Sequence, residues 1–94
     1  MKVLRVVYTS REKLAVALKY NPKTDFVPFV VAKGKEEVAE KIMELAKKSG
    51  VPIVRSSKIV GELFKLNVLE EIPEKMYVVI AEIIAFIQSQ KGSE

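Results

Sequence analysis

Residues 29–54 read Phe-Val-Val-Ala-Lys-Gly-Lys-Glu-Glu-Val-Ala-Glu-Lys-Ile-Met-Glu-Leu-Ala-Lys-Lys-Ser-Gly-Val-Pro-Ile-Val, and their pattern predicts a strand, a helix and a second strand. An apolar, β-rich run over 29–32 is followed by apolar residues at helical spacing over 35–48 and by a second short apolar run over 51–54. The helical part carries acids in its first turn and lysines in its last, which favours a helix electrostatically. A strand, a helix and a strand in this length are typical of a parallel crossover.

The segments on either side complete the sheet and cover it. Residues 2–20 form two β-rich runs around a polar turn, which predicts a hairpin, and residues 21–25 carry a strong loop signal. Helices are predicted over 58–66, with Ser56-Ser57 as the N-cap, and over 74–88. The expected α/β fold is a small four-stranded mixed sheet wrapped by three or more helices.

The length and composition fit one domain. Ninety-four residues of which 49% are hydrophobic, with a mean hydropathy of +0.13, favour a single folded unit over residues 1–94 with an irregular tail at 89–94. Ile80 and Ile83 of the last helix are expected in its core. The longest apolar run, 76–87, is interrupted by an acid and is too short to span a membrane.

Residue types that many enzymes need are missing. The sequence contains no Cys and no His, which excludes disulfides, thiol nucleophiles, zinc fingers and His-based triads. Its glycines are isolated rather than gathered in a phosphate-binding loop, and its acidic clusters have the pattern of solvated helix faces. We therefore expect no catalysis, no metal site and no cofactor.

Positive charge is concentrated in the first third of the chain. Residues 1–35 hold eight Lys or Arg and two acids, a net charge of +6, whereas residues 36–94 hold eight and ten, a net charge of −2. One function that such a basic region supports is binding of nucleic acid. The seven aromatic residues are scattered, however, which argues against stacking on single strands. Lys33 beside Gly34 could present an amine to an anion, but a Lys-Gly pair at the end of a strand and before a helix is more often a turn, so we predict that the strand stops there in a turn.

Several short motifs occur together in the order and spacing of one protein family. They are Ala-Val-Ala-Leu-Lys-Tyr at 15–20, Val-Ala-Lys-Gly at 31–34, Gly-Val-Pro-Ile-Val at 50–54, and Ile-Pro-Glu at 72–74 with Tyr77 and Ala-Glu at 81–82. Over residues 8–87 the chain resembles the cytoplasmic domain of the flagellar export-switch family (FlhB/YscU/EscU type). The resemblance implies a part of type III protein export that helps to change the exported class from rod and hook proteins to filament proteins.

The resemblance fails at the self-cleavage motif. Family members carry Asn-Pro-Thr-His before the Ala-Val-Ala-Leu strand and cleave themselves between Asn and Pro, whereas the matching positions here are Ser10, Arg11, Glu12 and Lys13. Neither the cyclising Asn nor the Pro is present, so we expect no autocleavage. An Asn-Pro pair at 21–22 lies after the strand and is expected to form a plain turn.

These observations predict a non-catalytic, stand-alone export-switch-like domain that binds export-apparatus proteins or export substrates. Lys33, Gly34 and Lys58 are the candidate protein-binding residues; Lys58 lies where the family's short helix carries an Arg. We expect a cytoplasmic protein, free or peripheral at the membrane export gate, that is a monomer or a weak homo-oligomer. The alternative function is a small basic nucleic-acid-binding protein.

Overall fold

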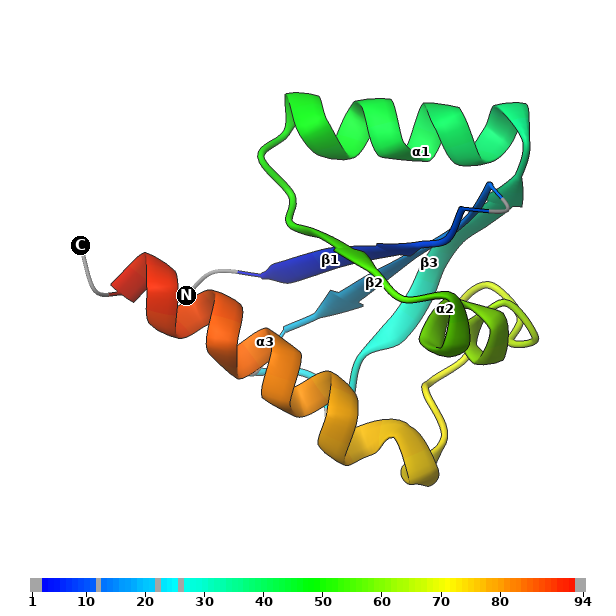
Figure 1. Ribbon diagram of the computed structural model, residues 1–94. Helices are drawn as coiled ribbons and strands as arrows, with labels where there is room; N and C mark the ends of the chain where they lie inside the picture. Colours follow the sequence, from blue (N-terminus) through cyan, green and yellow to red (C-terminus); the bar gives the residue numbers. More distant parts are fainter. Residues whose placement is uncertain (1–2, 12, 22, 26, 93–94) are drawn as a thin grey trace.

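The computed structural model describes residues 3–11, 13–21, 23–25 and 27–92, with side chains described as far as residue 85 (Figure 1). Its elements are β1 (Leu4–Thr9), β2 (Leu14–Tyr20), β3 (Phe29–Lys35), α1 (Glu37–Lys48), β4 (Ile53–Arg55), α2 (Ser57–Leu63), the 3-10 turn η1 (Glu74–Met76) and α3 (Tyr77–Gly92).

The four strands form one mixed sheet in the order β3-β2-β1-β4. β1 pairs antiparallel with β2, β2 pairs antiparallel with β3, and β4 lies parallel to β1. β3 and β4 are thus parallel strands at opposite edges of the sheet, joined through α1. The predicted hairpin, the parallel crossover and the four-stranded mixed sheet are all confirmed.

Helices cover both faces of this sheet (Figure 1). α1 lies over one face, where Val7 and Ala15 pack against Ala39 and Ala46 of the helix. The other face carries the larger core under α2 and α3, because the bulkier side chains of the strands alternate toward it. Its largest fully buried residues are Tyr8, Leu18, Leu63, Ile80, Val6, Val16, Val30 and Val60.

The prediction that Lys33-Gly34 forms a turn is wrong. β3 continues through both residues, with Lys33 opposite Val16 and Gly34 opposite Ala15 on β2. The chain turns after Lys35, at Glu36, whose φ of 53° is unusual for a residue with a side chain. Gly34 is needed because α1 passes close above it: a Cβ atom built there would lie 2.6 Å from the Cβ of Val38 and closer still to its Cγ1.

α2 and α3 differ slightly from their predicted bounds. Ser56 caps α2, its hydroxyl accepting a hydrogen bond of 3.3 Å from the Ile59 amide, and the helix ends at Leu63 rather than at residue 66. α3 continues to Gly92, so helix extends into the segment 89–94 that was expected to be an irregular tail; residues 93–94 lie outside the described part.

The inward face of α3 is narrower than its sequence suggested. Ile80 is fully buried, as predicted, and Met76 and Ile84 join it in the core. Ile83 is only half-buried at the margin of the core, and Val79 is 44% exposed. Among the α3 side chains described, up to Ala85, the stripe through Ile80 is buried in the core, Ile83 lies at its margin, and Val78 and Val79 are exposed.

Candidate functional site

The positions that match the self-cleavage motif form the tight turn between β1 and β2. The amide of Lys13 donates to the carbonyl of Ser10 over 3.1 Å, and the amide of Ser10 donates to the carbonyl of Leu14 over 3.2 Å. Lys13 closes the turn with a φ of 62°. Glu12 lies outside the described residues. Ser10, Arg11 and Lys13 thus belong to a hydrogen-bonded hairpin turn.

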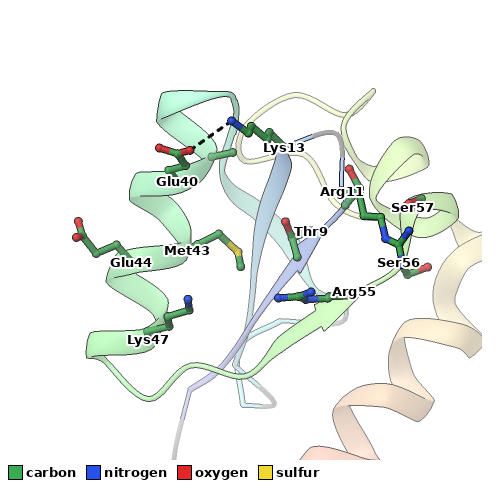
Figure 2. Close-up of a pocket in the computed structure, with 12 residues that line it drawn as sticks. Thr9, Arg11, Lys13, Glu40, Met43, Glu44, Lys47, Arg55, Ser56 and Ser57 are labelled. Atoms are coloured by element: carbon green, nitrogen blue, oxygen red, sulfur yellow. Dashed lines mark ion pairs between the residues drawn. The ribbon is translucent and has the colours of Figure 1, made fainter.

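This turn holds no activated nucleophile among the described residues. The hydroxyl oxygen of Ser10 is buried and has no hydrogen-bond partner among the described residues, so no base among them withdraws its proton. The amine of Lys13 lies 3.7 Å from a carboxylate oxygen of Glu40 on α1, an exposed ion pair (Figure 2).

Asn21 ends β2 in the turn that its sequence predicts. Its side-chain oxygen accepts from the amide of Lys23 over 3.0 Å, and its backbone carbonyl accepts from the amide of Asp25 over 2.8 Å. Pro22 lies outside the described residues. The Asn21 side chain is therefore held by the backbone of its own turn, as in ordinary Asx turns.

A cavity of about 840 Å³ opens beside the β1–β2 turn (Figure 2). Its walls come from that turn, from α1 and from the junction of β4 with α2. In Figure 2, Arg55 projects from β4 toward α1, while Arg11 projects from the turn toward Ser56 and Ser57. Its charged lining residues are Arg11, Lys13, Glu40, Glu44, Lys47 and Arg55.

The three candidate protein-binding residues do not form one surface. The amine of Lys33 donates to the carbonyl of Phe64 over 2.9 Å and lies 4.9 Å from the centre of its ring, which ties β3 to the end of α2. Gly34 faces the opposite side of the sheet, under α1, and Lys58 is exposed on α2. Protein binding by these residues stays a prediction.

The basic residues of the first third are also dispersed. Arg5 and Lys19 are register partners on β1 and β2, whereas Arg11 and Lys13 lie at the far end of the same hairpin. The amine of Lys33 donates a hydrogen bond to the carbonyl of Phe64. The described basic residues of this segment therefore do not form a single continuous basic face of the kind that follows a phosphate backbone.

A second, apolar hollow was not found from the sequence. It has a volume of about 330 Å³ and lies between the end of β2, the segment before β3 and the first half of α3. Exposed Tyr77, Ala81 and Ala85 belong to its α3 wall. The complete lining is Tyr20, Val27, Pro28, Ile72, Tyr77, Ala81, Ile84 and Ala85.

Two ionisable groups of the described residues have shifted pKa values, and neither lines these two cavities. Burial raises the pKa of Tyr8 to about 12, and the described part of the chain offers its hydroxyl no hydrogen-bond partner. The charge of Lys65 and a hydrogen bond from Lys75 hold the pKa of Glu62 below its usual range, on an exposed surface. Both shifts have structural causes and give no sign of an acid or base prepared for catalysis.

Within the described ranges, no three His, Cys, Asp or Glu side chains are grouped so that they could hold a metal ion. Nor does any helix in that part of the chain have the length and apolar character required to span a membrane.

Comparisons with known proteins agree with this geometry. Residues 4–87 match the sequence profile of the FlhB HrpN YscU SpaS family. The flagellar biosynthetic protein FlhB of Aquifex aeolicus is 44% identical over 87 residues, which are 92% of this chain and 25% of that protein. The uncharacterized protein YlqH of Bacillus subtilis is 45% identical over 73 residues, which are 78% of each chain. This chain thus spans about a quarter of the FlhB relative and most of YlqH.

The fold also matches solved structures. The cytoplasmic domain of FlhB from Shewanella putrefaciens superposes with a TM-score of 0.83 at 34% identity, covering 93% of this chain and 70% of that one. The EscU C-terminal domain carrying the P263A mutation superposes with a TM-score of 0.82 at 23% identity, covering 86% of this chain and 81% of that one, a likeness of fold. The profile match over residues 4–87 and the FlhB likeness together establish that this chain belongs to the FlhB HrpN YscU SpaS family of type III and flagellar protein export.

Proposed function

We propose that this chain is a non-catalytic binding domain of type III protein export, which acts in the cytoplasm and binds export-apparatus proteins or export substrates. Its family membership supports the process, since its relatives include flagellar biosynthetic proteins and a hypersensitivity response secretion protein. The positions of the self-cleavage motif support the lack of catalysis, because they form a closed turn with no activated nucleophile among the described residues.

The apolar hollow beside α3 is the observation that carries a binding role. It is large enough for one or two apolar side chains of a bound segment, and Tyr77 at its α3 wall supplies an aromatic contact with a polar end. Elsewhere on α3, Val78 and Val79 are 70% and 44% accessible but do not line the hollow, so the binding role is assigned to the hollow itself.

Binding through the hollow is tested with a substitution that fills it. Ala81→Arg places a long charged side chain at the α3 wall, where an apolar ligand side chain would lose its contact. Val78→Arg is the matched control, because it adds the same side chain to the same helix at a position that does not line the hollow.

The ligands are purified hook-class and filament-class export substrates from the same genome, with binding measured by biolayer interferometry. We expect the unmodified domain and Val78→Arg to bind at least one class, and Ala81→Arg to lose at least tenfold in affinity, which corresponds to about 1.4 kcal/mol. Circular dichroism checks that both variants fold. Equal binding by Ala81→Arg and the unmodified domain, or binding of neither class, contradicts the proposal.

A further inference from the structure

The cavity beside the β1–β2 turn carries an excess of unpaired positive charge. It is lined by four cations and two carboxylates, and one carboxylate, Glu40, is already paired with Lys13. Arg11, Lys47 and Arg55 take part in no ion pair with the described residues. They come from three different parts of the chain, and the fold brings their side chains together in one cavity.

Arginine at two of these three positions indicates the kind of ligand. A guanidinium group donates in a planar fork that matches a carboxylate, and such charge-assisted pairs are among the strongest hydrogen bonds in proteins. The wall also contains Glu44, so the cavity is not uniformly positive. A cavity that contains both charges fits a ligand whose carboxylates are spaced apart from one another. It fits a continuous polyanion, such as a nucleic-acid strand, less well.

The open edge of the sheet lies directly beside the cavity. β4 is the last strand in the order β3-β2-β1-β4, so no described strand covers its outer side. Pro52 and Ser56 form hydrogen bonds with β1, Pro52 through its carbonyl and Ser56 through its amide. Because backbone groups alternate in direction along a strand, the N–H and C=O groups of Ile53 and Arg55 point to the open edge.

The two features share a residue. Arg55 offers its backbone to the open edge, while its side chain lines the cavity on the α1 side of the sheet. A strand added beside β4 would direct every second side chain to that same side. An acidic residue in such a position would face Arg55 as a cross-strand partner, with Arg11 and Lys47 in the same cavity.

We propose that β4 and this cavity form a second protein-binding site, which takes an extended acidic segment of a partner protein by strand addition. The segment pairs its backbone with Ile53 and Arg55 and places alternate carboxylates among Arg11, Lys47 and Arg55. This site is separate from the apolar hollow, because the two cavities share no lining residue.

The test uses short peptides and the ¹⁵N-labelled domain in NMR titrations. The probe is acetyl-Val-Glu-Val-Glu-Val-Glu-amide, in which every carboxylate lies on one face of a strand. One control replaces each Glu with Gln, and a second, acetyl-Val-Val-Val-Glu-Glu-Glu-amide, keeps the composition but loses the alternation. A short DNA duplex is titrated separately.

We expect the alternating acidic peptide to shift the amide signals of Ile53 and Arg55, and the two control peptides to bind at least several-fold more weakly. Arg55→Gln should weaken binding of the acidic peptide about tenfold, and adding Arg11→Gln should weaken it further. Arg5→Gln, which removes an exposed arginine outside the cavity, is the matched control and should change binding of the acidic peptide less than twofold.

Three results would overturn the proposal: no shift at millimolar acidic peptide, equal binding of all three peptides, or equal losses in Arg55→Gln and Arg5→Gln. Tighter binding of the DNA duplex, with a steep dependence on salt, would assign the cations to nucleic acid instead. Since Ala81→Arg does not touch this site, its effect on substrate binding stays independent of these outcomes.

Discussion

Replacing Gly34 with alanine tests how closely α1 packs on the sheet. The added Cβ would lie 2.6 Å from the Cβ of Val38 and 3.3 Å from its backbone carbonyl carbon, both tighter than ordinary contacts between carbon atoms. Gly34 is not among the positive-φ glycines, so the cost comes from crowding rather than from backbone conformation. We expect Gly34→Ala to destabilise the domain by about 1–3 kcal/mol, as overpacked sites do.

The assay is urea denaturation followed by circular dichroism at 222 nm. With an m-value of about 1 kcal/mol/M for so small a domain, the midpoint should fall by about 1–3 M with little change in slope. Gly61→Ala is the matched control, because nothing lies within 4 Å of its added Cβ in the middle of α2. That substitution should stabilise the domain by about 0.5–1 kcal/mol.

A double-mutant cycle with Val38→Ala identifies the clash itself. Val38 is half exposed, so its own truncation should cost little, and it removes the Cγ1 atom that lies closest to the new methyl group. The cost of Gly34→Ala should therefore fall by about 0.5 kcal/mol or more in the Val38→Ala background. If Gly34→Ala is as stable as the unmodified domain, or if its cost is unchanged when the two methyl groups of Val38 are removed, the close packing of α1 on β3 is refuted.

Three further substitutions or measurements follow from the same structure. Ile80→Ala should cost about 2–5 kcal/mol in urea denaturation because Ile80 is fully buried, and an effect no larger than that of the exposed Val78→Ala would show that α3 does not pack there. Tyr8→Phe should stabilise the domain by about 1 kcal/mol at pH 7, because its buried hydroxyl has no partner among the described residues. Burial raises the pKa of Tyr8 from 10.0 to about 12, so the unmodified domain should lose stability as pH rises from about 10 to 12, a loss that Tyr8→Phe should lack. Intact-mass spectrometry after several days at neutral pH should give one full-length mass, whereas two fragments that meet at Ser10 or Asn21 would contradict the absence of autocleavage.

Much of the sheet was predictable because its strands follow simple local rules. The apolar runs of 4–9 and 14–20 pair across a short turn, and Pro52 stands just ahead of β4, where a proline costs no ladder hydrogen bond. Lys33-Gly34 was misread because a glycine before a helix usually marks a turn. Here Gly34 serves a long-range contact with Val38, and local sequence carries no signal for such a contact.

The candidate sites were predictable to different degrees. The turn at Ser10 was located by resemblance, because the strand after it aligns with the family's motif. The apolar hollow was not predictable, since its walls come from residue 20, residues 27–28 and residues 72–85, which only the folded chain brings together. Ile83 was expected beside Ile80 in the core, but it lies at the margin of the core. How many of the apolar residues of α3 are buried depends on tertiary packing, which the helical spacing does not give.

The most direct test of a protein-binding role is to map the surface that an export substrate contacts. The hook-class or filament-class substrate that the domain binds in interferometry is titrated into the ¹⁵N-labelled domain, and changes in amide signals are recorded residue by residue. We expect the changes to centre on the apolar hollow, at Tyr20, Val27, Ile72 and Ala81, and to disappear in Ala81→Arg. An unchanged spectrum at saturating substrate, or changes confined to the outer face of α1, would contradict this prediction.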